Sequence, residues 1–250
     1  MDKAYYDEYK YLERNHWWFK VRKLILEQYI KHIIYNNKKL IILNIGSATG
    51  ATSEFLNNFG EVRSIEYDKD CSIFSSKNLN LSVLNASITS LPFKSSKFDL
   101  VCAFDVIEHV ENDKEAVEEM HRVCKQNGNI LITVPAYQFL WSEHDNVNQH
   151  FRRYNKNKLK TLMNSILGNK IIYTSYFNSI LFPFISFFRL ISNIIPKDIY
   201  RKGAGSDFTI VNMDSFVNKV LYILFSFEII YLKYLKFPFG VSLMIHSKKD

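Results

Sequence analysis

A small-residue turn follows a largely apolar run early in the chain. Residues 40–45 read Leu-Ile-Ile-Leu-Asn-Ile, and residues 46–50 read Gly-Ser-Ala-Thr-Gly. Glu66 stands twenty residues after Gly46, where the next apolar run ends. A strand that leads into such a turn lets backbone N–H groups approach a ligand, and an acid on the next strand accepts hydrogen bonds from ribose hydroxyls. This spacing predicts a site for a nucleotide-type cofactor.

The turn favours one such cofactor over another. A dinucleotide site needs a second glycine two residues after the first, where the backbone lies against a pyrophosphate, and this chain has Ala48 there. S-adenosylmethionine (SAM) has no pyrophosphate, so a close backbone turn and an acid for its ribose suffice. We therefore predict SAM as the cofactor. An NAD-dependent oxidoreductase on the same fold is the alternative.

Polar and basic side chains gather in a later loop, at His144, Asp145, His150, Arg152, Arg153 and Tyr154. Histidines titrate near neutral pH and can take a proton from a hydroxyl group. Arginines hold carboxylates and phosphates through paired hydrogen bonds. His144 and His150 are therefore candidate catalytic bases. Arg152, Arg153 and Tyr154 are candidate substrate-binding residues, and a loop held by internal salt bridges is the alternative.

The hydrophobic pattern places these residues on alternating strands and helices. Strands are predicted at residues 40–45, 62–66, 81–84, 98–104, 129–134, 170–177 and 240–246. Helices are predicted at residues 4–35, 52–59, about 70–78, 113–125 and 156–167, with Gly60, Gly128 and Gly168 ending three of them. The alternation predicts an α/β fold with a doubly wound, mostly parallel sheet, which binds ligands at the carboxyl ends of its strands.

Two strongly apolar stretches, residues 177–196 and 216–235, lie in the C-terminal part of the chain. A membrane-spanning helix needs about 20 apolar residues with few charges. Charged residues interrupt both stretches, and the first also contains Pro183. We therefore expect a buried lid or a helix that lies in a membrane interface.

Positive charge is concentrated in the same part of the chain. Residues 151–250 hold 15 Lys and Arg against 5 Asp and Glu, whereas residues 1–150 hold 17 against 20. Such a surface attracts phosphate, anionic lipid or nucleic acid, and a solvated basic face is the alternative. The aromatic residues sit in apolar runs and do not alternate with Arg and Lys, so we expect no nucleic-acid partner. A peripheral membrane contact is the expectation that remains.

The three cysteines, Cys71, Cys102 and Cys124, lie far apart and form no metal-binding spacing. We therefore expect reduced thiols, no disulfide framework and no metal site. The polar, acidic start of the chain is not a secretory signal. These features predict a cytoplasmic protein, with peripheral contact at the inner face of a membrane.

Six motifs occur in the order in which class I SAM-dependent methyltransferases carry them, and the chain resembles that family. The motifs are residues 42–50, 65–66, 91–93, 98–101, 105–110 and 121–128, within a match that covers about residues 40–136. Three positions depart from the family pattern. Asn44 replaces an acid, Ala48 replaces a glycine, and Ser87 replaces an aspartate that contacts the adenine.

The resemblance implies a Rossmann-like sheet of seven strands with an antiparallel last strand, an N-terminal helix, and an apolar helical insertion before that strand. It also implies the residues that hold SAM, which are Asn44, Gly46, Ser47, Ala48, Gly50, Glu66, Tyr67, Ser87, Ile88, Phe104 and Asp105. Asp105 would face the sulfonium and the acceptor. Its alternative is a helix cap, because Asp105 and Glu108 have capping-box spacing. His109 is a third candidate base or a packed helix residue.

The flanks resemble a bacterial methyltransferase subgroup whose members often accompany genes for surface polysaccharides or glycolipids. The resemblance rests on residues 13–19, 141–145 and 150–154, and on the apolar run after residue 177. It implies an anionic, lipid-linked or saccharide acceptor. Within the first of these stretches, the aromatic residues 17–19 either fasten the N-terminal helix to the core or form a lid that excludes water from the cofactor.

We therefore predict a SAM-dependent methyltransferase that forms a single domain over residues 1–250. Residues 1–38 form an N-terminal helical cap, and residues 39–177 form the cofactor-binding core with an acceptor loop at 137–155. Residues 178–238 form the apolar insertion, and residues 239–250 form the last strand and tail. The three departures and the apolar insertion leave one further alternative, a non-catalytic adaptor that keeps the fold and binds a membrane or a partner.

Overall fold

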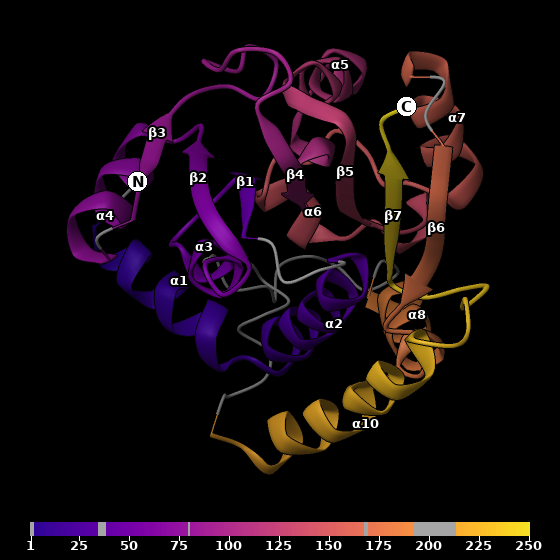
Figure 1. The fold of residues 1–250 in the computed structure, drawn as a ribbon. Helices are drawn as coiled ribbons and strands as arrows, with labels where there is room; N and C mark the ends of the chain where they lie inside the picture. Colours follow the sequence, from indigo (N-terminus) through magenta and orange to yellow (C-terminus); the bar gives the residue numbers. More distant parts are fainter. Residues whose placement is uncertain (1–2, 35–38, 80, 168–169, 193–213) are drawn as a thin grey trace.

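The fold is built on one sheet of seven strands with helices on both faces (Figure 1). The computed structural model describes residues 3–34, 39–79, 81–167, 170–192 and 214–250. The strands are β1 (Leu40–Ile45), β2 (Gly60–Glu66), β3 (Val83–Asn85), β4 (Phe98–Phe104), β5 (Cys124–Pro135), β6 (Lys170–Phe177) and β7 (Ser242–Lys248). The helices described are α1 (Lys3–Asn15), α2 (Trp17–Ile33), α3 (Ala51–Leu56), α4 (Lys69–Leu79), α5 (Asp113–Val123), α6 (Glu143–Val147), α7 (Lys156–Leu167), α8 (Phe182–Ser192) and α10 (Phe216–Leu232).

The strand order is β3-β2-β1-β4-β5-β7-β6. Strand β7 runs antiparallel to both of its neighbours, β5 and β6, whereas the other neighbouring strands run parallel. The predicted doubly wound sheet with an antiparallel last strand is therefore confirmed. The chain order reverses between β1 and β4, and the crevice at the carboxyl ends of those two strands is where such sheets bind ligands.

Strand β4 is apolar and buried from Leu100 to Phe104, where helices cover both of its faces (Figure 1). Val101 and Ala103 belong to the core on the side of α5 and α7. Leu100 and Cys102 belong to the core on the side of α2, α3 and α10. Successive side chains of a strand point to opposite faces, so the two cores share this strand and fix its carboxyl end between them.

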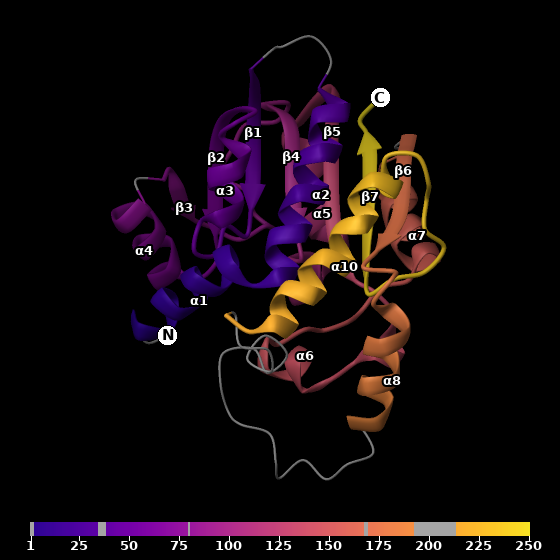
Figure 2. The same cartoon turned by 90° about the horizontal axis from the view of Figure 1, so that it is seen from below.

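The predicted N-terminal helix is in fact two helices. Helix α1 ends at Asn15, and His16 has an extended backbone with φ −68° and ψ 137°. The His16 ring accepts a hydrogen bond from the N–H of Trp18 and thereby caps the first turn of α2. The break lets α1 turn away from α2 and cross the carboxyl edge of the sheet (Figure 2).

Two glycines that were predicted to end helices lie elsewhere. Helix α3 ends at Leu56, and Gly60 begins β2, where an added Cβ would lie 2.0 Å from the carbonyl oxygen of Leu40. Gly60 therefore permits close strand pairing, which is a different task from helix capping. Gly128 lies inside β5, which follows α5 directly. Gly168 lies outside the described residues.

The predicted insertion contains α8 and α10, and its residues 193–213 lie outside the described residues. Helix α8 lies beyond the carboxyl edge of the sheet, whereas α10 packs along α2 (Figure 2). Trp17 of α2 packs edge-on against Phe225 of α10, and the Trp17 backbone N–H donates to Asn218 at 3.0 Å. Among the described helices, none combines the length and the apolar character that crossing a membrane would require.

A buried carboxylate joins α10 to the segment before α8. Glu228 is 0% exposed and accepts a hydrogen bond from the backbone N–H of Ile180 at 2.7 Å. Burial raises the pKa of Glu228 to about 7, although backbone N–H groups near residue 180 oppose the shift. The ionised side chain is therefore less stable in the folded protein than in the unfolded chain.

Folding stability should fall as Glu228 ionises. The contribution of the protonated Glu228 side chain to the free energy of unfolding is fully present below about pH 4.5 and is lost as the pH rises through about 7. Glu228→Gln keeps an acceptor for Ile180, and its gain in unfolding free energy over wild type should be about 3 kcal/mol larger at about pH 8 than at about pH 4. Urea titrations at both pH values measure this difference.

The matched control is Glu118→Gln on α5, because the exposed Glu118 carboxylate meets water in both the folded and the unfolded chain. That variant should show no comparable gain at high pH. A gain from Glu228→Gln that stays the same at both pH values would contradict the assignment.

Candidate active site

The turn after β1 has a left-handed backbone. The angle φ is +71° at Gly46, +43° at Ala48 and +90° at Gly50. The N–H groups of Gly46 and Ser47 both donate to the carbonyl oxygen of Ile65, at 3.0 and 3.1 Å, so the turn is fastened to the end of β2. Glycine adopts a positive φ without strain, whereas Ala48 does so at an energetic cost.

Gly46 is also the point at which two loops touch. A Cβ added at Gly46 would lie 2.5 Å from Cγ2 of Val106, which follows β4. A side chain at residue 46 would therefore push the loop after β1 away from the loop after β4. The absence of a side chain there keeps the two loops in contact at the crevice of the sheet.

The Glu66 side chain reaches the same turn. One of its carboxylate oxygens accepts a hydrogen bond from the Ala48 N–H at 2.8 Å, and the other accepts from the Asp68 N–H at 3.0 Å. Burial raises the pKa of Glu66, and these two donors oppose the shift. The proximity that the spacing predicts is present, and the contact of Glu66 with a ribose stays a prediction.

Helix α1 is tied to the loops after β1 and β2. The Tyr6 hydroxyl donates to Asp68 at 3.0 Å, and Asp68 also accepts from the Cys71 N–H at 2.9 Å at the start of α4. Glu13 accepts a hydrogen bond from the Thr49 hydroxyl, and burial raises the pKa of Glu13 to about 7. The N-terminal helices therefore cover the turn.

A cavity of about 430 Å³ lies beside the turn. Its lining includes Gly46 and Ala48 of the turn, Asp105, Glu108 and His109 after β4, His144, His150 and Arg153 of the acceptor loop, and Trp17, Trp18, Phe19, Phe184 and Phe188 of the surrounding helices. Trp17 and Phe19 are both 8% exposed, so they are anchored in the core while they cover the cavity. The burial agrees with the fastening of α2 to the core, and the lid over the cofactor stays a prediction.

Asp105 begins the loop after β4 with a left-handed backbone, at φ +56°. Its carboxylate pairs with Arg22 at 2.7 Å and accepts a hydrogen bond from the Thr133 hydroxyl at 3.2 Å. The short 3₁₀ turn that follows (Ile107–His109) begins after Val106, without a capping side chain among the described residues. The capping-box alternative for Asp105 is therefore wrong, because Arg22 of α2 takes the carboxylate.

Two histidine rings meet edge-on in the cavity, with the centroids of His109 and His150 4.5 Å apart. Nδ1 of His109 lies 2.8 Å from the carbonyl oxygen of Asn148, which can only accept, so Nδ1 carries the proton. Removal of water by the surrounding protein, together with His150, lowers the pKa of His109. His144 lies farther away, with its ring centroid 6.1 Å from that of His150.

Asp145 is the buried centre of the acceptor loop. Arg153 donates to both of its carboxylate oxygens, at 2.8 and 2.9 Å, and the Ser142 N–H donates at 2.8 Å. Nδ1 of His150 lies 2.8 Å from the carboxylate. Burial favours the protonated acid, but the hydrogen bond from His150 and the charge of Arg153 hold the pKa of Asp145 well below its usual range. This part of the loop therefore agrees with the alternative interpretation of the sequence, in which internal salt bridges hold the loop.

Arg152 and Tyr154 are not among the described residues that line the cavity. Arg152 pairs with Asp113 at 2.8 Å, and the buried Tyr154 donates to the same carboxylate at 2.7 Å. Both side chains therefore fasten the acceptor loop to the start of α5. Their contact with an acceptor stays a prediction that this geometry does not favour.

The predicted cofactor residues fall into two groups. Gly46, Ala48, Phe104 and Asp105 line the cavity. The others lie in the strands and turns at the same edge of the sheet, and they are Asn44, Ser47, Gly50, Glu66, Tyr67, Ser87 and Ile88. Asn44 is buried behind the turn, where its amide donates to Ser53 at 2.9 Å, so it supports the turn from below. Tyr67 is 79% exposed.

Two residues of the site, Glu108 and Arg22, were not predicted from the sequence. Glu108 is fully buried, and neither of its carboxylate oxygens has a hydrogen-bond partner among the described residues. Burial and the nearby Asp105 raise the pKa of Glu108 well above its usual range. Arg22 lies among the apolar residues that α2 buries, and a charged residue in such a stripe is a signal for a buried partner.

The family model described as "Methyltransferase domain" matches residues 43–132. The uncharacterized protein MJ1252 of Methanocaldococcus jannaschii is 31% identical over an alignment of 180 positions, which covers 68% of this chain and 67% of that protein. MJ0638 of the same organism, also uncharacterized, is 31% identical over 140 residues, and the match takes in 56% of this chain but only 59% of that relative.

The same fold occurs in a solved SAM-dependent methyltransferase from Archaeoglobus fulgidus. The TM-score is 0.59 at 16% sequence identity, and the match covers 98% of this chain and 100% of the other. This chain belongs to the class I SAM-dependent methyltransferases, and its cofactor is SAM. The predicted family and cofactor are thereby confirmed, and the NAD alternative is not supported.

The residues at the turn fit this cofactor. Gly46 and Ala48 line the cavity with backbone and with no side chain larger than a methyl group. The Glu66 carboxylate accepts a hydrogen bond from the Ala48 N–H. A turn without bulky side chains leaves room for an adenosyl ligand, and the oxygens of the half-buried Glu66 carboxylate can accept further hydrogen bonds from ribose hydroxyls.

Glu66→Ala should weaken the binding of S-adenosylhomocysteine by about 1–3 kcal/mol, because a half-buried hydrogen-bond partner is lost. Isothermal titration calorimetry measures the change. Glu61→Ala is the matched control, because Glu61 lies on the same strand with its side chain 62% exposed, and it should bind as wild type does. Equal affinities for Glu66→Ala and wild type would remove Glu66 from the cofactor site.

Proposed function

We propose that this protein transfers the methyl group of SAM to a hydroxyl group of an acceptor held in the cavity. The observation that carries the proposal is the shared lining, because Gly46 and Ala48 of the turn border the same cavity as His109 and His150. When bound, SAM supplies an electrophilic methyl group. The protein must then align the acceptor with the bond from sulfur to methyl and keep water away.

The side chains of α2 suit the exclusion of water. The Arg22 guanidinium lies over the Trp18 ring, 5.1 Å from its centroid, and pairs with Asp105. This arrangement links the aromatic cover of the cavity to the loop after β4. Asp105 therefore receives a buried counter-charge on one side and faces the cavity on the other.

His150 is the residue that we assign to activation of the acceptor. A hydroxyl group must lose its proton during methylation, whereas an amine needs only its lone pair. The Asp145 carboxylate holds Nδ1 of His150, which leaves the other ring nitrogen as the basic atom. Arg153 and Ser142 hold Asp145 in turn, so the orientation of the ring is fixed by buried groups.

His150→Ala should lower the rate of methyl transfer by about 100-fold, because the group that accepts or directs the proton is lost. The measurement uses SAM with a labelled methyl group and a cell-envelope extract as the source of acceptor. Calorimetry with S-adenosylhomocysteine should show unchanged cofactor affinity. His32→Ala, on the exposed surface of α2, is the control and should react as wild type does.

Two outcomes would contradict the proposal. An unchanged rate for His150→Ala would remove this residue from the chemistry. Label that enters no component of the extract with the wild-type protein would favour the non-catalytic adaptor instead.

We further propose that the acceptor is an anionic or lipid-linked saccharide that is reached from a membrane surface. Helix α8 exposes one apolar stripe at helical spacing, with Phe184 at 72%, Phe187 at 68%, Phe188 at 53% and Ile191 at 40%. Phe184 and Phe188 also line the cavity. An exposed apolar stripe of this kind suits the interface of a membrane, and here it lies at the acceptor cavity itself.

Helix α10 carries a second apolar stripe. Ile223, Phe227 and Ile230 are 54%, 51% and 62% exposed, and their spacing places them on one side of the helix. The exposed Lys233 and Lys236 follow directly after this helix. Lysines beside apolar stripes favour a surface of anionic lipid, such as the inner face of a membrane.

Phe187→Ser combined with Ile191→Ser should weaken binding to vesicles of phosphatidylglycerol and phosphatidylcholine by about tenfold, because two buried apolar contacts with lipid are lost. Vesicle flotation at low salt measures the bound fraction. Tyr11→Ser, an exposed aromatic residue on α1, is the control and should bind as wild type does. If no wild-type protein floats with the vesicles, the membrane proposal is wrong, whereas the proposed methyl transfer is not affected.

A further inference from the structure

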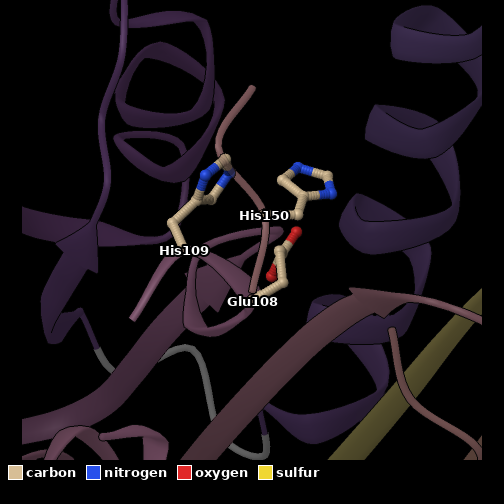
Figure 3. A group of neighbouring side chains, drawn as sticks. All are labelled: Glu108, His109 and His150. Atoms are coloured by element: carbon tan, nitrogen blue, oxygen red, sulfur yellow. The ribbon is translucent and has the colours of Figure 1, made fainter. Parts of the chain in front are cut away.

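Three side chains meet at one wall of the cavity. Glu108 and His109 come from the turn after β4, and His150 comes from the acceptor loop (Figure 3). Each side chain offers one ligand atom, and these atoms lie within 4.8 Å of one another. We call these three residues the Glu-His-His cluster. Figure 3 shows the carboxylate of Glu108 pointing toward the two imidazole rings.

The Glu108 carboxylate accepts no hydrogen bond from the residues that the structure describes. The residue is 0% exposed, and both carboxylate oxygens are without a hydrogen bond among the described residues. Burial of an unpaired carboxylate is strongly unfavourable, so such groups are found paired with a charge or bound to a metal. The other two residues of the cluster offer imidazole nitrogens within 4.8 Å of the carboxylate, and such nitrogens are good ligands for divalent metals.

Both histidines are held in the orientation that metal-binding histidines adopt. Such a histidine donates one ring N–H to a carbonyl or a carboxylate and uses the other nitrogen as a ligand. Nδ1 of His109 lies 2.8 Å from the Asn148 carbonyl oxygen, and Nδ1 of His150 lies 2.8 Å from the Asp145 carboxylate. Nε2 of each ring is therefore the nitrogen that remains for the cluster.

We propose that Glu108, His109 and His150 bind a divalent cation in the acceptor cavity. Two imidazole nitrogens and one carboxylate suit zinc, iron or manganese, and three protein ligands leave coordination positions open. The expectation that the chain has no metal site considered only its cysteines, which lie outside this cluster.

The role of the cation rests on the proposed methyl transfer. A cation at this wall would hold an oxygen of the acceptor and favour the loss of its proton. His150 would then act through the cation instead of as a free base. The open positions would select acceptors with two adjacent oxygen atoms, such as a vicinal diol or a hydroxy acid, since these can chelate.

Cobalt(II) provides a direct readout that does not depend on activity. The protein, freed of metal with a chelator, is titrated with Co²⁺ while the visible absorption of the ion is recorded. We expect saturation at one Co²⁺ per chain and loss of the signal when Zn²⁺ is added. Glu108→Gln and His150→Ala should each bind Co²⁺ at least about tenfold more weakly. His32→Ala, outside the cluster, should bind as wild type does.

Glu108→Gln keeps the size and shape of the buried side chain, and circular dichroism verifies that both variants are folded. An unchanged spectrum of Co²⁺ with wild-type protein would overturn the inference. Equal binding by wild type and both cluster variants would also overturn it, because the metal would then sit on surface groups. The labelled-methyl assay on the wild-type protein separates this failure from failure of the proposed function, because methyl transfer without Co²⁺ binding would overturn the cluster alone.

Discussion

The attachment of the turn after β1 to the end of β2 sets the geometry of the whole site. Two N–H groups of the turn share the carbonyl oxygen of Ile65, and the next residue, Glu66, accepts a hydrogen bond from Ala48. The turn therefore cannot tilt away from the sheet without breaking several buried hydrogen bonds. Because Gly46 also touches Val106, the same attachment fixes the starting point of the loop that carries Asp105 and the Glu-His-His cluster.

Two groups of helices cover the site from different sides. Helices α1 and α2 lie over the cofactor turn, and ion pairing of Arg22 with Asp105 joins them to the loop after β4. Helix α8 lies on the acceptor side, where Phe184 and Phe188 are part of the cavity wall and of the exposed surface. The cavity is therefore covered by two segments that lie far apart in the chain, the N-terminal helices and α8 (Figure 2).

The strands and the turn could be predicted because buried strands are short, mostly apolar runs and Glu66 lies a fixed distance along the chain from Gly46. The break at His16 could not, because apolar residues recur at helical spacing on both sides of a cap that depends on one ring nitrogen. The helix cap was only an alternative for Asp105, and the sequence did not point to its ion pair with Arg22, because Arg22 is distant along the chain. His150 lies in the cluster because the chain after α6 comes back to the turn that follows β4. No local sequence pattern predicts this contact.

Hydrogen exchange of the backbone amides, with and without S-adenosylhomocysteine, tests the central claim most directly, because it locates the ligand on the chain. We predict slower exchange at residues 46–50, 66–68 and 105–109 when the ligand is bound, and unchanged exchange in β6. Protection that is absent from residues 46–50, or that is centred on another part of the sheet, would contradict the assignment of this turn as the cofactor site.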